Sequence, residues 1–189
     1  RAAQKKKSSE GKKQKKCCVV GAIGSDDSLE RARSDWLLNG VIRPVAEEKG
    51  YAVSRADELA APGMIDSQVI NEVHDSDLVI ADLTDHNPNA FYELAIRHMA
   101  GKPVIHMIEK TERIPFDVGA FRTLRFSLGT FGDFQNAKDA LSQQIEYVRD
   151  NPQDIDNPIL TARGKLETYQ HASNKEKFLL NQIETLNKR

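Results

Sequence analysis

The chain has 189 residues, of which 39% are hydrophobic and 29% are charged. This composition is sufficient for one ordinary globular domain and excludes a fully disordered chain. The longest apolar runs, residues 17–20 and 78–81, are far shorter than the roughly 18 residues that a membrane-spanning helix requires. We therefore expect no membrane partner.

The net charge of −1 is unevenly distributed. Residues 1–16 hold Arg1 and seven lysines against Glu10, a sum of +7. The rest of the chain therefore carries −8, because the whole carries −1. An acidic body argues against nucleic acid as a partner. The lysine-rich stretch has no apolar periodicity, so we predict a disordered leader over residues 1–16.

Two cysteines, Cys17 and Cys18, are adjacent in the sequence. Neighbouring residues of a strand point to opposite faces, so a disulfide between them would be strained. Their spacing fits no metal site either, and we predict free thiols, a reducing compartment and a cytoplasmic location.

The chain begins with Arg1 and shows no signal peptide, which leaves open that it is a piece of a longer protein.

From Cys17 onward, strand-like and helix-like periods alternate, which is typical of an α/β domain with a parallel sheet. A helix is predicted from a cap at Ser34 to Lys49, with Trp36 in its buried stripe and a kink or break at Pro44. A later helix has Asn87 as its cap and buries Phe91, Leu94, Ala95, His98 and Met99. The remaining predicted elements are strands over residues 17–23, 51–54, 77–81, 104–108 and 122–128, and helices over 65–73 and 137–148.

These elements predict a doubly wound, flavodoxin-like, five-stranded parallel sheet over residues 17–150. Residues 151–189 are predicted to form an irregular connection and a polar C-terminal helix near 175–187. Ligands of such sheets bind beyond the carboxyl ends of the strands, where the strand order reverses. For the order 2-1-3-4-5, that point lies between the first and third strands.

Two carboxylates follow the third predicted strand. Asp82 ends the strand, and Glu93 lies in the opening turns of the next helix. Such a pair suits glycosidic chemistry, in which one carboxylate attacks the anomeric carbon and the other handles a proton. There are simpler interpretations: Glu93 has Arg97 four residues later, the spacing of a surface ion pair, and Asp82 suits a loop start.

The loop after the first strand contains Gly24 and Ser25, followed by Arg31 and Arg33. A glycine permits close approach of a ligand, and hydroxyl and guanidinium groups suit a phosphate. The two arginines are equally well interpreted as exposed charges before a helix. No Walker sequence or dinucleotide fingerprint is present.

The segments 77–84, 87–95 and 101–105 together resemble the nucleoside 2-deoxyribosyltransferase superfamily. That group includes nucleotide N-glycoside hydrolases and lies near the TIR-like NAD-cleaving domains. The resemblance covers approximately residues 17–128, and the stretch around Glu93 is its most specific part. Residues 57–58 and 62–65 also look like this group's exit from the second strand. The chain differs from the group in having Ala95 where a glycine is common.

The resemblance implies an N-glycosidase or glycosyl transferase acting on a nucleoside, nucleotide or related N-glycoside. Glu93 would be the nucleophile and Asp82 its assistant at the sugar or base. No cofactor or metal is needed for that reaction, and a homo-oligomer is typical of the family. Alternatives are a TIR-like NAD hydrolase effector in defence or signalling, and a non-catalytic nucleotide-binding sensor. The predicted substrate-binding residues are Gly24, Ser25, Asp57, Asn87 and Asn89.

Overall fold

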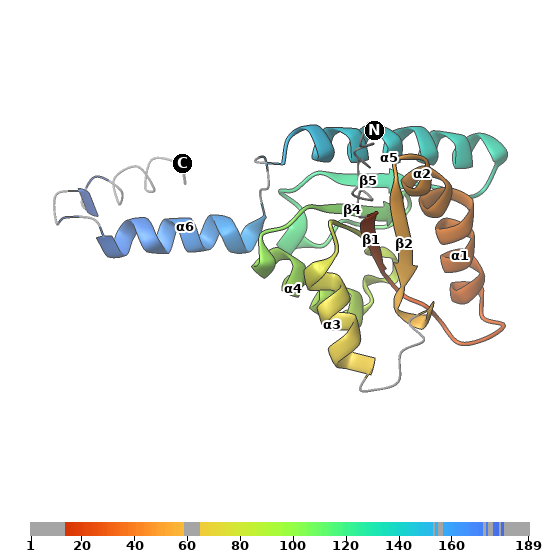
Figure 1. The fold of residues 1–189 in the computed structure, drawn as a ribbon, viewed down its shortest axis with the longest axis horizontal. Coiled ribbons are helices and arrows are strands. Elements are labelled where there is room, and N and C mark those ends of the chain that lie inside the picture. The colour runs from red at the N-terminus through yellow and green to blue at the C-terminus, as the bar shows by residue number, and fades with distance from the viewer. Residues whose placement is uncertain are drawn as a thin grey trace, which may run out of the picture.

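A computed structural model describes residues 14–58, 65–152, 154, 157–171, 173, 176, 177 and 179. Five parallel strands form one sheet in the order β2-β1-β3-β4-β5 (Figure 1). This is the doubly wound, flavodoxin-like α/β arrangement predicted from the sequence. The strands are β1 (Lys15–Val20), β2 (Tyr51–Arg55), β3 (Leu78–Asp82), β4 (Val104–Glu109) and β5 (Thr123–Phe126).

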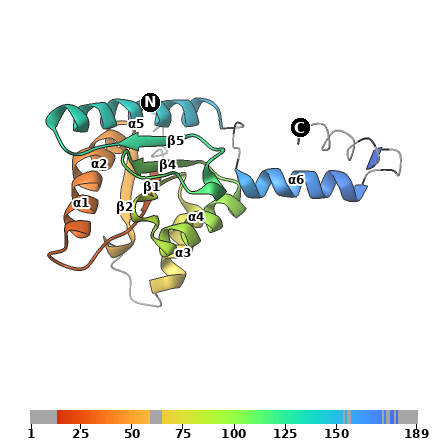
Figure 2. The same cartoon turned by 180° about the vertical axis from the view of Figure 1, so that it is seen from behind.

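Helices cover both faces of the sheet (Figures 1 and 2). On one face pack α1 (Leu29–Leu37), the π-helical turn η1 (Leu38–Ile42), α2 (Arg43–Glu48) and α5 (Phe131–Asp150). On the other face pack α3 (Ile65–Asp75) and α4 (Pro88–Ala100). Three short 3-10 turns, η2 (Ala56–Glu58), η3 (Thr84–His86) and η4 (Phe116–Val118), lie in the connections.

The sheet buries apolar side chains on both faces, as a central parallel sheet requires. β3 is buried along its whole length. The predicted free thiols are confirmed: Cys17 packs in the core beneath α5 and Cys18 in the core beneath α3 and α4, and both are unbonded. Burial raises the pKa of the Cys18 thiol to about 12. It therefore behaves as a small apolar side chain.

The first helical segment differs from its prediction. Its N-cap is Ser28, whose Oγ accepts a hydrogen bond from the Arg31 N–H at 3.0 Å. Ser34 lies inside the helix and is buried, and Trp36 is 60% exposed. Pro44 causes no break: it stands at the start of α2, directly after the π-helical turn, and the backbone there stays in the right-handed helical region. The preceding π turn keeps the chain helical from α1 into α2.

The helix α4 begins at its predicted cap. The Asn87 side chain accepts hydrogen bonds from the N–H groups of Asn89 and Ala90, and Gly101 ends the helix in the left-handed conformation, φ 62°. Its predicted buried face was partly wrong, because Ala95 and Met99 are exposed. These two positions lie a turn apart on the side facing away from the sheet.

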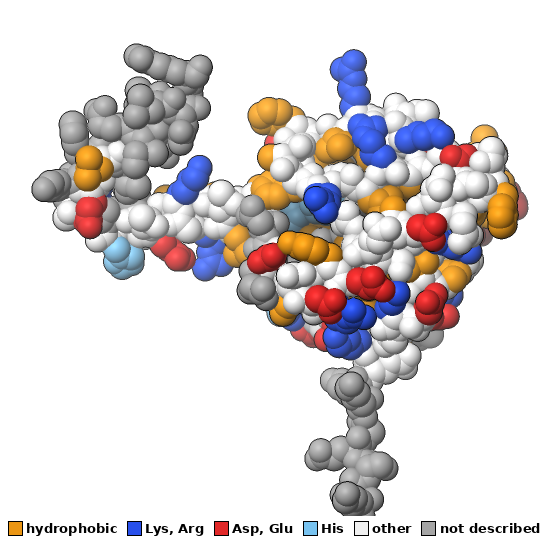
Figure 3. All heavy atoms as spheres, turned by 90° about the horizontal axis from the view of Figure 1, so that it is seen from above, with side chains coloured by type: hydrophobic (Ala, Val, Ile, Leu, Met, Phe, Trp, Pro, Cys, Tyr) orange, Lys and Arg blue, Asp and Glu red, His pale blue; other side chains and the backbone are white. Residues whose placement is uncertain are grey.

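The termini of the domain also differ from the sequence-based boundaries. Lys15 and Lys16, assigned to the leader, belong to β1 and pair with β2. A helix, α6 (Pro158–His171), occupies most of the predicted irregular connection and extends away from the sheet and its helices (Figures 1 and 3). The predicted terminal helix near 175–187 lies almost wholly outside the described residues. No described helix is long and apolar enough to cross a membrane.

Candidate functional site

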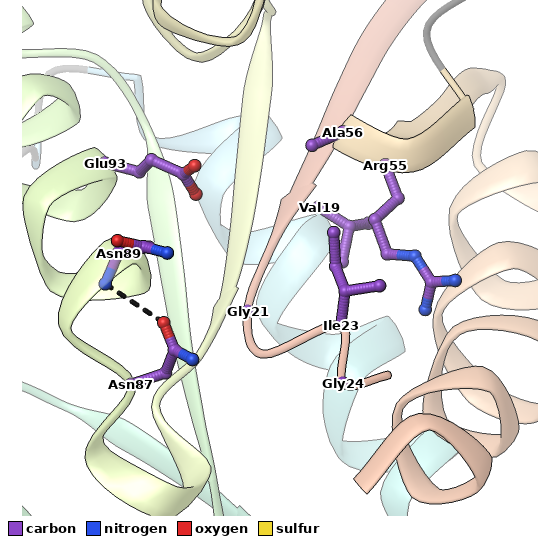
Figure 4. Close-up of a pocket in the computed structure, with 9 residues that line it drawn as sticks. All are labelled: Val19, Gly21, Ile23, Gly24, Arg55, Ala56, Asn87, Asn89 and Glu93. Carbon is purple, nitrogen blue, oxygen red and sulfur yellow. Dashed lines mark hydrogen bonds between the residues drawn. The ribbon is translucent and has the colours of Figure 1, made fainter. Parts of the chain in front are cut away.

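A cavity of about 220 Å³ opens at the carboxyl ends of β1, β2 and β3, between the first and third strands of the chain (Figure 4). This is where the reversal of strand order leaves a crevice. The volume is below the roughly 300–1,000 Å³ of sites that enclose drug-sized ligands. The cavity is lined by Val19, Gly21, Ile23, Gly24, Arg55, Ala56, Asn87, Asn89 and Glu93.

Glu93 is the acidic group of this cavity. It lies on α4, and Figure 4 shows its carboxylate directed from the helix into the cavity, toward the ends of β1 and β2. Among the described residues, no hydrogen bond or ion pair to this carboxylate is found. Burial raises its pKa to about 7. A half-buried carboxylate without a partner is costly to ionise, and such groups concentrate at functional sites.

The simpler interpretation of Glu93 was a surface ion pair with Arg97, and it is wrong. Arg97 is fully buried and donates only to backbone carbonyl oxygens. The i, i+4 spacing suggested the pair, but the guanidinium extends toward the opposite end of the sheet, where α3 ends and β4 begins. Glu93 is thereby left free to face the cavity.

Asn87 and Asn89 share the wall formed by α4 (Figure 4). The side-chain oxygen of Asn87 caps the helix, accepting from the N–H of Asn89 at 3.0 Å and of Ala90 at 3.3 Å. Capping uses only this oxygen, so the Asn87 side-chain NH₂ remains a donor beside the cavity. Both asparagines were predicted to bind substrate, and both line the same wall as Glu93.

Asp82 does not line the cavity, so the expected pair of facing carboxylates is not present in its wall. Its carboxylate is buried and accepts hydrogen bonds from the Thr84 hydroxyl and, at 3.0 Å, from the Thr84 N–H. Burial raises the pKa of Asp82, although the two bonds from Thr84 oppose the shift. Arg33 approaches it at 3.9 Å and pairs with Asp85 at 2.6 Å. Asp82 therefore braces the β3–α4 connection.

The loop after β1 is held close to α1. Gly24 lines the cavity with φ +75°, and a Cβ there would lie 2.6 Å from the Arg31 nitrogen. Only glycine fits both the conformation and the contact. Ser25, predicted beside it, is exposed and outside the lining; its carbonyl accepts from the Ser28 N–H at 3.1 Å.

Arg55 forms the opposite wall, and sequence reasoning missed it. It ends β2, and its side chain is only 5% exposed. The guanidinium donates to Ser34 Oγ at 2.9 Å, Asp35 Oδ1 at 2.6 Å and Asp57 Oδ1 at 2.7 Å. Its position in a strand adjacent to β1, at the carboxyl end of the sheet, was the available signal. Figure 4 shows the guanidinium turned away from Glu93.

Arg31 completes a closed charge cluster with Arg55, Asp35 and Asp57, which we call the quartet. Arg31 donates to Asp35 Oδ2 at 3.0 Å and pairs with Asp57 Oδ2 at 2.9 Å. Hydrogen bonds from Arg55 hold the pKa of Asp57 below its usual value. The predicted phosphate ligand Arg31 and substrate ligand Asp57 thus pair with each other, outside the cavity lining. Two positive and two negative charges cancel.

Arg33, the other predicted phosphate ligand, lies outside the cavity lining as well. Its Nε and Nη2 atoms are buried and have no hydrogen-bond partner among the described residues. Metal ligation finds no support in the described part of the chain, where no group of three or more His, Cys, Asp or Glu could hold an ion.

Comparisons with known proteins found similar solved structures at low identity. No protein-family model and no curated protein matches the sequence. The CMP N-glycosidase BcmB of Clostridium botulinum is 13% identical, with a TM-score of 0.46 over 67% of this chain and 99% of that one. The 2-deoxyribosyltransferase of Bacillus psychrosaccharolyticus is 14% identical, with a TM-score of 0.46 over 66% of this chain and 90% of that one.

A third similar structure is the 2-desoxiribosyltransferase of Leishmania mexicana. It is 18% identical, with a TM-score of 0.40 over 64% of this chain and 81% of that one. The doubly wound α/β fold of this chain is established by its own strand order and helix placement.

Proposed function

We propose that this protein cleaves the N-glycosidic bond of a nucleoside, nucleotide or related N-glycoside, with Glu93 as the nucleophile. The observation that supports the proposal most is the Glu93 carboxylate, which has no partner among the described residues and lies in a cavity at the point where the strand order reverses. The same reaction is implied by the resemblance of the segments around Glu93 to the nucleoside 2-deoxyribosyltransferase superfamily.

In the first step, the ionised Glu93 carboxylate attacks the anomeric carbon of the sugar. A carbon–oxygen bond forms, the glycosidic carbon–nitrogen bond breaks with its electron pair, and the leaving base gains a proton. In the second step, water releases the free sugar in a hydrolase, or another base accepts the sugar in a transferase. Either second step restores the Glu93 carboxylate.

The other residues of the α4 wall suit the recognition of a sugar. The amide groups of Asn87 and Asn89 both donate and accept hydrogen bonds, as sugar hydroxyls do. Gly24 and Gly21 leave the β1 side of the cavity open to a ligand. The apolar side chains of Val19 and Ile23 offer a surface for a base or for the face of the sugar ring.

The role of Asp82 changes in this proposal. Its carboxylate bonds to Thr84 and is not in the lining, so we assign it to holding the β3–α4 connection, from which Asn87 and α4 begin. The proton for the leaving base would then come from solvent or from a group supplied with the substrate. Ser25, Asp57, Arg31 and Arg33 receive no direct role at the substrate.

The test is release of a free base from a panel of nucleosides, nucleoside 5′-monophosphates and NAD, followed by chromatography. Wild-type protein should release base from at least one class, and Glu93→Gln should lose at least about 10³-fold in rate. Glu47→Gln is the matched control, because Glu47 is an exposed glutamate of α2, away from the cavity. Equal rates for wild type and Glu93→Gln would contradict the proposal.

A second measurement separates catalysis from binding. Acid quenching during turnover, followed by mass spectrometry, should find a sugar adduct on the peptide that contains Glu93. Thermal stabilisation by a nucleotide without any product over hours would instead indicate a binding module. NAD as the only substrate cleaved would indicate the TIR-like alternative.

A further inference from the structure

Arg97 is a buried cation of α4 that binds no carboxylate of the residues that the structure describes. Its side chain is fully buried, and its guanidinium donates five hydrogen bonds to four backbone carbonyl oxygens. Nη1 donates to the carbonyl oxygens of Val73 at 2.9 Å, His74 at 3.2 Å and Ser76 at 2.9 Å. Nε and Nη2 both donate to the carbonyl oxygen of Pro103, at 3.1 and 3.0 Å.

These carbonyl groups belong to two segments that flank α4. Val73 and His74 lie in the last turn of α3, and Ser76 follows the helix directly. Pro103 precedes β4, and its carbonyl also accepts from the Val79 N–H of β3 at 3.1 Å. One side chain therefore ties α4 to α3, to the start of β3 and to the start of β4.

Arg97 satisfies carbonyl oxygens at the C-terminal end of α3, and its hydrogen bonds also restrict the orientation of α4. Burying a cation is unfavourable, and apolar packing can hold a helix against a sheet without one. Apolar packing of Ala90 and Leu94 already holds α4 against the sheet. Such packing has little directional preference, whereas hydrogen bonds from a planar guanidinium fix an orientation. What Arg97 adds is a defined rotation of α4 about its axis.

That rotation determines where Glu93 points. Side chains four residues apart lie on the same face of a helix, one turn above the other. We infer that Arg97 is a positioning residue, which fixes the rotation of α4 so that the Glu93 carboxylate faces the cavity rather than solvent. The inference rests on the proposed function only in that it concerns the same carboxylate.

Three charged or titratable groups lie on the elements around Glu93. Cys18 of β1 is close enough for the Glu93 charge to raise its pKa. Arg55 of β2 stands across the cavity with its guanidinium paired within the quartet. Arg97 itself keeps its proton at neutral pH, since burial lowers its pKa only to about 10. The orientation of Glu93 can therefore be read from its own titration.

The test is the titration of Glu93 by NMR in protein labelled with ¹³C at the glutamate carboxyl groups, with Glu93→Gln assigning the signal. In wild type the midpoint should lie near 7, as expected from its burial. In Arg97→Met, α4 is free to turn, water reaches Glu93, and the midpoint should fall by one pH unit or more toward 4.5. Loss of a nearby positive charge alone would raise the midpoint. A midpoint that is unchanged or higher in the folded variant overturns the inference.

Arg97→Lys keeps the charge but has lost the planar fork, so its midpoint should also fall, by a smaller amount. It decides the question if Arg97→Met does not fold. Arg43→Met is the matched control, because Arg43 also ties a helix to the sheet, donating to the Val53 carbonyl at 3.0 Å, but belongs to α2. Its Glu93 midpoint should equal that of wild type, and a fall there would overturn the inference too.

Kinetics give an independent result. If the proposed function holds, Arg97→Met should lower kcat by about 100-fold and change KM little, because a misplaced nucleophile mainly affects the chemical step. Equal kcat values would overturn the positioning role. If wild type releases no base from any substrate, the proposed function fails while the NMR titration still tests Arg97.

Discussion

The two walls of the cavity use charge in opposite ways. On the α4 wall, the Glu93 carboxylate has no ionic partner among the described residues, and burial raises its pKa to about 7. On the β2 wall, Arg55 is tied within the quartet, where each carboxylate bonds to both arginines. The α4 wall leaves this carboxylate unpaired within the described part of the chain, whereas the paired charges of the β2 wall hold the structure around it.

The β2 wall also shows why an arginine that lines a cavity need not be a ligand for an anion. Arg55 donates four hydrogen bonds to Ser34, Asp35 and Asp57. Burial lowers its pKa, but the bonds to Asp57 and Asp35 raise it overall. A substrate would have to break this arrangement to gain the guanidinium, so the arginine contributes shape and rigidity to the wall.

The largest expected effect follows from breaking the quartet. Arg55→Met leaves Asp35 and Asp57 with Arg31 alone, and removing the buried member of this partly exposed cluster costs up to about 3 kcal/mol. Urea unfolding should show this loss in the free energy of unfolding. Arg31→Met should cost less, because the Arg31 side chain is 29% exposed. Equal losses for the two variants would contradict the central position of Arg55.

The pH dependence of the proposed reaction is the next largest effect. The nucleophile must be ionised, and the pKa of Glu93 is raised to about 7. The rate kcat/KM should therefore fall as pH decreases below 7, by about tenfold per unit, and so by about 100-fold at pH 5. A profile that stays flat down to pH 5 would exclude Glu93 as the group that must be ionised.

The same pKa shift predicts a smaller effect on stability. The pKa of Glu93 lies near 4.5 in the unfolded chain and near 7 in the folded protein. The folded state therefore binds more protons between these values, and stability decreases as pH rises through this window. Glu93→Gln removes the cost of ionisation. It should raise the free energy of unfolding by about 1–2 kcal/mol at pH 8, after allowance for partial exposure, and by nothing at pH 4.

Thermal unfolding at the two pH values checks this expectation. Glu47→Gln serves as the control, since Glu47 is exposed and should show no pH-dependent gain. A Glu93→Gln variant that is less stable than wild type at pH 8 would mean that the carboxylate has a stabilising partner after all. That result would remove the contrast between the two walls.

The parts of this site that depend on neighbouring residues in the sequence could be predicted, and the parts that depend on contacts between distant segments could not. The α4 wall was predictable, because the cap at Asn87, the proline after it and the position of Glu93 are local features of one segment. The strand order followed from the alternation of elements, and it placed the crevice correctly. Gly24 was found because a glycine directly after a strand is a local signal.

The β2 wall depends on contacts that no local pattern encodes. Arg55 and Asp57 meet Arg31 and Asp35 only because β2 lies beside β1 and α1 packs over both. The same limit explains Arg97. Its spacing from Glu93 suggested an ion pair, but the carbonyl groups that bind it come from segments more than twenty residues earlier in the sequence and from the turn before β4.

The cap of α4 gives the smallest expected effect and the finest test of the α4 wall. Asn87→Ala removes the oxygen that accepts from the N–H groups of Asn89 and Ala90, and should cost about 1 kcal/mol of stability in urea unfolding. Asn87→Asp keeps a capping oxygen and should cost little, because a carboxylate is favourable at a helix N-terminus. It does replace the side-chain NH₂ that faces the cavity. If that NH₂ binds substrate, Asn87→Asp should lower kcat/KM at unchanged stability. If capping is the whole role of Asn87, activity should follow stability in both variants.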